Sequence, residues 1–361
     1  MLAIEFEQLS ALGLTPALAN RAAALATSDS APLELLRITV IHRSTIGVHD
    51  GRTERSARPL ARLARALSEE GTALAVGDWV VAACDAFGEV WIEARVPPSS
   101  HIARRDGDGC VHPVVSNVDV ALLLMGLDDD FNPRRLERYL ALVHGDAIMP
   151  VVVLTKADVA APTPELLEER LGLLNGRVPP HVEVFAVNAM DASAARALHG
   201  YLGRGQTLVL LGSSGAGKST LTNTLLGTAV QDTGAVRVHD GRGRHTTTAR
   251  SLHCLPGGAC VIDTPGLRAL RPDSDEAALA ARYDDVETLA AHCQFRDCRH
   301  AQEPGCAVRE GIGVDRLRNY HKLLREVRRD TMTALDRQRQ RAAWKERGRA
   351  AKVRMKAKRG E

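Results

Sequence analysis

The sequence predicts a mixed α/β protein in which a small β-barrel precedes a parallel-sheet domain, and a helical module with a metal site follows. Short β-prone runs separated by Gly, Asp and Ser clusters fill residues 34–115, which is typical of a small barrel. Over residues 116–272, apolar strand-like runs alternate with helical patterns, and this indicates a parallel sheet covered by helices. In residues 273–330 the strand-like runs stop and cysteines crowd near a histidine.

The composition places the chain among globular proteins. Its 361 residues can form several domains that each bury a core, and 45% hydrophobic and 25% charged residues are ordinary values. No apolar stretch approaches the roughly 20 residues of a membrane span, and the N-terminus lacks a basic leader. We therefore expect a cytoplasmic protein with no membrane partner, acting as a monomer.

The C-terminal tail, residues 331–361, is strongly basic. From Arg325 to Glu361, fourteen Lys or Arg residues stand against five Asp or Glu residues, although the whole chain carries only +3. An acidic body therefore precedes a basic tail, which favours polyanionic partners. The alternative is a solvated helix face without a partner.

The N-terminal elements follow from composition. Residues 1–33 are rich in Ala and Leu and predict short helix. In the barrel region no helical period separates the later β-prone runs. The expected strands there are Leu36–Ile41, Thr72–Val81 and Val90–Val96.

In the central region a strand is repeatedly followed by a helix. Asn132 is a helix cap with Pro133 in the first turn, and Thr163 precedes a second helix. The expected strands are Val118–Met125, Val151–Leu154, Val182–Val187, Gln206–Leu211 and Cys260–Asp263.

A glycine-rich segment between an expected strand and an expected helix matches the phosphate-binding pattern G-x-x-x-x-G-K-S. Its glycines let backbone N–H groups approach phosphate oxygens, Lys218 supplies positive charge to the β- and γ-phosphates, and the Ser219 hydroxyl can bind Mg²⁺. A plain glycine-rich turn is the alternative, and the flanking elements disfavour it. The expected nucleotide-binding residues are Gly212, Ser213, Ser214, Gly215, Ala216, Gly217, Lys218, Ser219 and Thr220.

Two further segments could complete the magnesium and γ-phosphate contacts. Asp263 ends an apolar strand and could hold Mg²⁺ through water, while the Gly266 N–H could meet the γ-phosphate. Thr247, in a polar glycine-containing stretch, is the candidate that completes the Mg²⁺ shell. Ordinary solvated turns are the alternative for both segments.

Four residues at the end of a buried strand are candidates for reading the base, because α/β sheets place ligand contacts there. The Asp158 carboxylate can accept the N1–H and the exocyclic N–H of guanine, which adenine cannot offer, and the Lys156 stem can lie along the base. A surface turn is the alternative for so short a motif. The four residues are Thr155, Lys156, Ala157 and Asp158.

These motifs occur in an unusual order, because the base-reading motif precedes the phosphate loop. In this order the sequence resembles the circularly permuted GTPases, specifically the RsgA family of small-ribosomal-subunit biogenesis GTPases. The resemblance covers nearly the whole chain. It is carried by the two nucleotide motifs, the cysteine cluster and the segments Val76–Trp79, Arg244–Thr248 and Asp263–Gly266.

The resemblance implies an N-terminal OB-fold, a circularly permuted P-loop GTPase domain and a C-terminal zinc module. It further implies GTP hydrolysis with Mg²⁺, coupled to late maturation of the small (30S) ribosomal subunit, with rRNA binding and stimulation by the particle. Thr155 stands where Asn is commoner, and Asn helps to tie the base loop to the phosphate loop, so we expect weaker nucleotide affinity. A second base-side motif, expected at Val187–Ala189, is degenerate.

The cysteine cluster offers three thiolates and one imidazole within fourteen residues. These are Cys293, Cys298, His300 and Cys306, a closed four-ligand set for structural Zn²⁺. Free residues in a reduced loop are the alternative. Because no ligand position is left for water, the site is expected to be structural.

The candidate catalytic residues are Lys218 and His245. Many GTPases orient the attacking water with a Gln directly after the D-x-x-G motif, but Leu267 stands there and has no hydrogen-bonding group. A neutral His245 imidazole, beside the threonines of the polar stretch, can accept a proton or orient water. An exposed loop histidine is the alternative. For the whole chain, the alternatives to a GTPase are a nucleotide-regulated RNA-binding scaffold and an ATPase, which Asp158 opposes.

Overall fold

The computed structural model describes residues 2–26, 32–42, 45–105, 111–143, 147–160, 164–227, 250–264 and 276–330. The chain divides into two compact units, Met1–Asp273 and Ser274–Glu361. Within the described ranges no helix is both long and apolar enough to cross a bilayer.

A closed five-stranded barrel forms the N-terminal part of the first unit. Its strands follow one another in the order β2-β3-β4-β6-β5, and β5 pairs with β2 to close the barrel. Leu36, Val48, Val80 and Ile92 are buried inside it. The elements are β1 (Leu2–Ala3), α1 (Phe6–Ser10), α2 (Pro16–Leu25), β2 (Leu33–Ile41), β3 (Ile46–His49), β4 (Glu54–Pro59), α3 (Ala61–Glu69), β5 (Trp79–Cys84) and β6 (Val90–Arg95).

The barrel departs from the expected elements, since β3 and β4 were not among the expected strands. Strand β5 begins only at Trp79, because the preceding residues form a turn in which Gly77 has a φ of +91° and packs against Ser116. A Cβ on Gly77 would lie 2.1 Å from the Ser116 carbonyl oxygen, so the turn requires glycine. The helix α3, which precedes β5, was not predicted.

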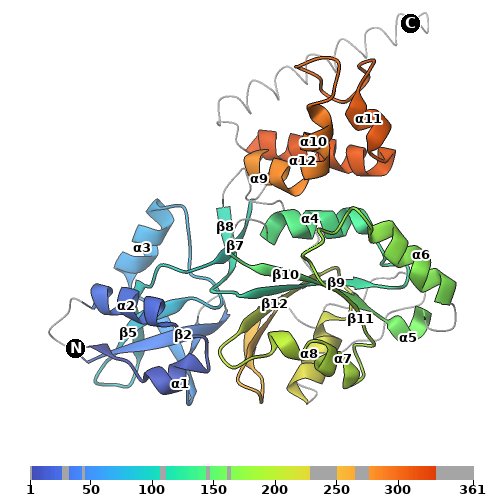
Figure 1. The fold of residues 1–361 in the computed structure, drawn as a ribbon. Helices are drawn as coiled ribbons and strands as arrows, with labels where there is room; N and C mark the ends of the chain where they lie inside the picture. The colour runs from blue at the N-terminus through green and yellow to red at the C-terminus, as the bar shows by residue number, and fades with distance from the viewer. Residues whose placement is uncertain are drawn as a thin grey trace, which may run out of the picture. The chain divides into compact units, whose positions relative to one another are not determined.

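A parallel sheet follows, with the strand order β11-β10-β9-β12-β14. The helices α4 and α6 cover one face and α7 and α8 cover the other, as Figure 1 shows. The expected central strands are confirmed, since β9, β10 and β12 are buried apolar runs. The elements are β9 (Val120–Gly126), α4 (Pro133–Val143), β10 (Met149–Thr155), α5 (Ala157–Ala160), α6 (Pro164–Leu174), β11 (Val184–Ala186), α7 (Ser193–Ala197), the 3₁₀ turn His199–Tyr201, β12 (Thr207–Gly212), α8 (Lys218–Leu226), β13 (Ser251–Cys254) and β14 (Cys260–Asp263).

The barrel and the parallel sheet are joined directly. β13 is antiparallel to β14 and meets β2 at Ser251 and Val40, while β7 (His101–Arg105) and β8 (Val111–Ser116) form a separate hairpin. The fully buried Arg37 guanidinium donates to the Leu12 carbonyl, to the Asn117 carbonyl at 2.9 Å and to the Thr207 hydroxyl at 2.9 Å. One barrel side chain therefore holds the start of β12, the strand that leads into the phosphate loop.

The second unit is a small helical module. Its core contains Tyr283, Val286, Val308 and Leu323. The Arg316 guanidinium donates to both Asp285 carboxylate oxygens at 2.7 and 2.9 Å, which fixes α12 against α10. The helices are α9 (Glu276–Arg282), α10 (Asp284–Ala290), α11 (Ala307–Gly311) and α12 (Val314–Asp330).

Candidate functional site

The phosphate-binding pattern occupies the turn between β12 and α8. Gly215 and Gly217 have φ values of +84° and +85°, which favour glycine. A Cβ on Gly212 would lie 2.8 Å from the Leu124 carbonyl oxygen, so glycine is also needed for close approach to β9. The helix α8 then begins at Lys218, and its first N–H groups lie at the turn, an arrangement suited to anions.

Lys218 is the cation of this turn and is largely buried, with 7% of its surface exposed. Its ammonium donates to the carbonyl oxygens of Gly212 at 3.1 Å and Ser213 at 2.7 Å. Burial lowers the pKa of Lys218, and the carboxylates of Asp263 and Asp130 oppose that shift. The charge is therefore held inside the curve of the loop by backbone oxygens and two nearby anions.

Asp263, at the end of β14, faces the first turn of α8. Ser219 Oγ donates to Asp263 Oδ2 at 3.2 Å, and burial raises the pKa of the carboxyl. The other oxygen, Oδ1, is buried without a hydrogen-bond partner among the described residues. A buried carboxylate oxygen next to a serine hydroxyl fits a divalent cation, because such ions prefer oxygen ligands.

The base-reading candidates lie directly beside the phosphate loop. Thr155, fully buried at the end of β10, donates from Oγ1 to the Ala216 carbonyl at 2.9 Å. Thr155 therefore makes a tie between the two loops through its hydroxyl. Ala157 N donates to Val187 O at 3.2 Å, so the expected second base-side segment adjoins this loop. Asp158 is exposed at the start of α5.

Two acidic residues of this site were missed by the sequence reasoning. Asp128 forms an ion pair with Lys156, 2.5 Å from its Nζ, and Lys156 itself has a φ of +60°. Asp130 accepts the Ser213 hydroxyl at 2.7 and 2.6 Å and pairs with Arg135 at 2.7 Å. Burial disfavours the charge on Asp128, but the Lys156 ammonium and the hydrogen bond from the Asp130 backbone N–H together outweigh burial, and the pKa is lowered. The available signal was an acidic run directly after a buried strand, where parallel sheets gather ligand contacts.

Three further candidates, His245, Thr247 and Gly266, lie outside the described residues.

The cysteine cluster does come together in the second unit. The ligand atoms of Cys293, Cys298, His300 and Cys306 all lie within 4.8 Å of one another. His300 Nδ1 is 3.6 Å from Cys293 Sγ and 3.5 Å from Cys306 Sγ, and those two sulfurs are 3.9 Å apart. The sulfurs are too far apart for a disulfide of about 2.05 Å, and the cluster could hold a metal ion.

The chain is similar to known proteins in sequence. The sequence model described as RsgA GTPase matches residues 96–272. Proteins named "Small ribosomal subunit biogenesis GTPase RsgA" from Xanthomonas axonopodis pv. citri (strain 306) and Xanthomonas campestris pv. campestris (strain B100) are each 49% identical over 260 residues. Both alignments cover 70% of this chain and 69% of the relative.

Two solved structures share the fold. The crystal structure of YjeQ from Thermotoga maritima matches with a TM-score of 0.56 at 21% identity, covering 82% of this chain and 98% of that one. YloQ, described as a circularly permuted GTPase, matches with a TM-score of 0.55 at 20% identity, covering 83% and 97%. The candidate base-reading segment precedes the glycine-rich loop in sequence and contacts it in space, and the chain belongs to the RsgA family of circularly permuted GTPases.

Proposed function

We propose that this protein binds GTP between the base loop and the phosphate loop and hydrolyses it to GDP and phosphate. The observation that carries this proposal is the contact from Thr155 to Ala216, which fixes a carboxylate-bearing base loop against a complete phosphate loop. In this assignment Gly212 to Thr220 surround the phosphates and Lys218 balances their charge. Asp158 accepts the two guanine N–H groups, while Lys156, held by Asp128, lies along the base.

Magnesium would be held on the Asp263 side of the phosphates. Ser219 and Asp263 are the described candidates, and the unpartnered Oδ1 of Asp263 supports them. Thr247 is proposed to complete the shell and Gly266 to meet the γ-phosphate. Bound there, Mg²⁺ would neutralise charge that develops on the phosphates.

His245 is proposed to orient the attacking water, because Leu267 offers no hydrogen-bonding group where many GTPases have Gln. Without that Gln the protein alone would hydrolyse GTP slowly, which fits an enzyme whose site is completed by a partner.

The proposed partner is the small (30S) ribosomal subunit with its rRNA. Support comes from the relatives, which are named small ribosomal subunit biogenesis GTPases, and from the basic composition of residues 331–361. We place the protein in the cytoplasm, where this subunit is assembled, and propose that it acts as a monomer.

The metal of the cysteine cluster is proposed to be zinc. A tetrahedral zinc site with Zn–S bonds of about 2.3 Å and Zn–N bonds of about 2.0 Å has S···S edges of about 3.8 Å and S···N edges of about 3.5 Å. The 3.9, 3.6 and 3.5 Å separations between the Cys293, Cys306 and His300 ligand atoms support this. Four protein ligands leave no open position, so the zinc would stabilise the module.

Hydrolysis of GTP and ATP by the purified protein tests the proposal, with Lys218→Ala as the matched variant. We expect cleavage of GTP in preference to ATP, and loss of turnover in Lys218→Ala because the phosphates lose their fixed counter-charge. Binding of guanine nucleotide without any turnover, even with small subunits present, would instead favour a nucleotide-regulated RNA-binding scaffold.

A further inference from the structure

The hairpin of β13 and β14 places two cysteines directly opposite each other. Cys254 and Cys260 are register partners in this antiparallel pair, and the side chains of such partners lie on the same face of the sheet. Both are free thiols. The proposed GTPase function uses neither of them, and neither belongs to the metal cluster of the second unit.

The two cysteines form the kind of cross-strand pair in which side chains approach most closely. The Cys260 N–H donates to the Gln206 carbonyl, just before β12, at 2.8 Å, so the backbone groups of Cys260 point away from Cys254. The hydrogen-bonded pair is the next one toward the turn, where the Leu255 N–H donates to the Ala259 carbonyl at 2.7 Å. Partners without such bonds have Cα atoms about 4.5 Å apart, within the roughly 4.4–6.8 Å that a disulfide spans.

The turn between the cysteines is short and well fixed. Residues 256–258 are Pro-Gly-Gly, and the Gly258 N–H donates to the Leu255 carbonyl at 2.9 Å. Gly258 has a φ of +83°, a conformation that favours glycine. Because the turn already holds the two sulfurs on one face, a bond between them needs little rearrangement, which favours an intramolecular reaction.

The surroundings of the pair favour a thiolate. A hydrogen bond from the Cys254 thiol, helped by the Arg37 guanidinium, lowers the pKa of Cys260 to about 7 against the effect of burial. The same contact raises the pKa of Cys254. Arg37 is fully buried, and within the described part of the chain it forms no ion pair and donates only to neutral oxygens. One negative charge shared by the two sulfurs is therefore stabilised near neutral pH.

The two thiols differ in their access to solvent. Cys254 is exposed, whereas Cys260 is fully buried with its Sγ 3.7 Å from the Ala11 carbonyl oxygen. An oxidant dissolved in water therefore meets Cys254 first, and Cys260 lies behind it as the second thiol. Thiols that respond to oxidants are accessible, readily ionised and next to a resolving cysteine. Two cysteines that served only as small apolar side chains would both be expected in the core.

We propose that Cys254 and Cys260 are an oxidation site for hydrogen peroxide that closes to a disulfide. The Cys254 thiolate attacks peroxide, so that an S–O bond forms, the O–O bond breaks and hydroxide leaves. The Cys260 thiolate then attacks the Cys254 sulfur, so that the S–S bond forms, the S–O bond breaks and a second hydroxide leaves. Each hydroxide takes up a proton released by a thiol and becomes water, and the two electrons lost by the sulfurs reduce the peroxide.

The disulfide is expected to be reversible. Cytosolic reductants keep thiols reduced, and the disulfides that do form there are usually transient and responsive to oxidants. The inference goes beyond the proposed GTP hydrolysis and does not depend on it.

Peptide mapping of the full-length protein tests the proposal. Protein purified under reducing conditions is treated with hydrogen peroxide or left untreated, its free thiols are alkylated, and it is digested with trypsin. Cleavage after Arg250 and Arg268 puts both cysteines on one peptide, residues 251–268. After peroxide we expect this peptide to lose two hydrogen atoms and to take up no alkyl group. After dithiothreitol it should take up two.

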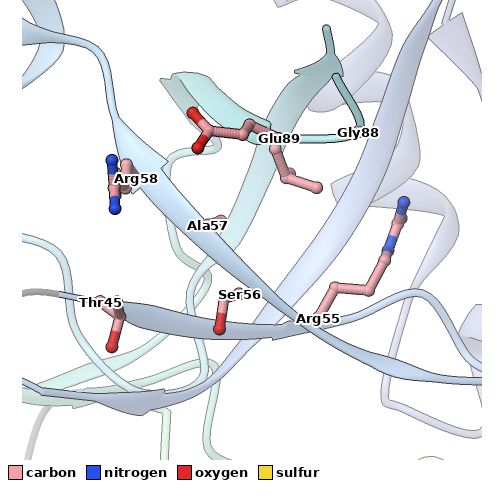
Figure 2. A pocket seen from close by; sticks show the side chains of 8 residues that line it. Thr45, Arg55, Ser56, Ala57, Arg58, Gly88 and Glu89 are labelled. Carbon is pink, nitrogen blue, oxygen red and sulfur yellow. The ribbon is translucent and has the colours of Figure 1, made fainter. Parts of the chain in front are cut away.

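Cys84, a half-buried thiol near the end of the same unit's strand β5, provides an internal control. Its register partner is Val90, which lines the pocket of about 380 Å³ shown in Figure 2, so no second thiol stands opposite it. Cys84 should stay alkylated at the peroxide concentration that closes the pair. The cysteines of the metal cluster lie on other tryptic peptides, so their oxidation is counted separately.

Two single variants separate the roles of the two sulfurs. Cys260→Ser keeps the exposed thiol without its resolving partner, so dimedone, which reacts with sulfenic acids, should label Cys254. Cys254→Ser keeps only the buried thiol, and dimedone labelling should be lost. Thermal unfolding checks that each variant retains the fold, and the mapping of the unaltered protein does not depend on either variant.

Full alkylation of residues 251–268 after peroxide treatment would overturn the proposal. A disulfide that joins this peptide to a different one would overturn it as well. Oxidation of Cys84 at the same peroxide concentration would show general thiol oxidation in place of a site. Equal dimedone labelling of the two variants would contradict Cys254 as the sulfur that meets peroxide.

Discussion

Replacing Thr155 with valine tests whether the tie between the base loop and the phosphate loop sets nucleotide affinity. Valine has nearly the shape of threonine but no hydroxyl, so Thr155→Val removes the 2.9 Å hydrogen bond to the Ala216 carbonyl. Both residues are fully buried, and water cannot replace the lost donor easily. The substitution therefore removes one hydrogen bond and leaves no cavity.

The size of the expected effect follows from the burial of the Ala216 carbonyl, which loses its hydrogen-bond donor. Leaving such a group without a partner costs about 1–3 kcal/mol in free energy of unfolding. In the proposed function GTP bridges the two loops, so their spacing would have to be restored when the nucleotide binds. If about 1 kcal/mol of the loss appears in binding, the dissociation constant rises about 5-fold.

Titration with a fluorescent GDP analogue measures the affinity, and urea unfolding measures the stability. Thr155→Ser keeps the hydroxyl and should retain most of the affinity. If Thr155→Val binds GDP as tightly as Thr155→Ser, the hydroxyl does not control the spacing of the two loops. The weaker affinity expected for Thr compared with Asn stays a prediction, which Thr155→Asn would test directly.

Three further predictions concern the other candidate residues. Asp158→Asn should reduce discrimination between GTP and ATP by about 10- to 150-fold, the range for a hydrogen bond to a charged group, and undiminished discrimination would remove the base-reader role. Cys306→Ser should lose the bound zinc and the protease resistance of the second unit, because structural zinc contributes about 10–16 kcal/mol to folding. The control Cys254→Ser changes an exposed thiol outside the cluster and should keep about one zinc per chain, measured by atomic absorption. His245→Ala should bind GTP normally yet lose most particle-stimulated turnover, and full stimulation would clear His245 of a catalytic role.

The strands of the nucleotide site could be predicted because they are central in the sheet. β9, β10 and β12 are covered by helices on both faces, so each is a continuous apolar run. The barrel strand β4 is different, since its sequence Glu-Arg-Ser-Ala-Arg-Pro has one fully buried residue, Ala57. A strand with a solvated outer face and few apolar residues gives little pattern to detect.

The metal-ligand candidates and the acidic residues of the nucleotide site also differ in how far the sequence could predict them. The four metal-ligand candidates are close in sequence, so spacing alone indicated them. Asp128 and Asp130 reach Lys156 and Ser213 only because β9 lies between β10 and β12 in the sheet. That order places three strand ends together and is not visible from the neighbouring sequence.

Single-turnover hydrolysis of GTP with and without small ribosomal subunits tests the central claim most directly. Excess protein is mixed with radiolabelled GTP or ATP, and phosphate release is followed over time, with Lys218→Ala as the inactive control. We predict slow cleavage of GTP alone, much faster cleavage with small subunits, and little cleavage of ATP in either case. Equal rates for GTP with and without subunits, or ATP cleavage as fast as that of GTP, would contradict a subunit-stimulated GTPase.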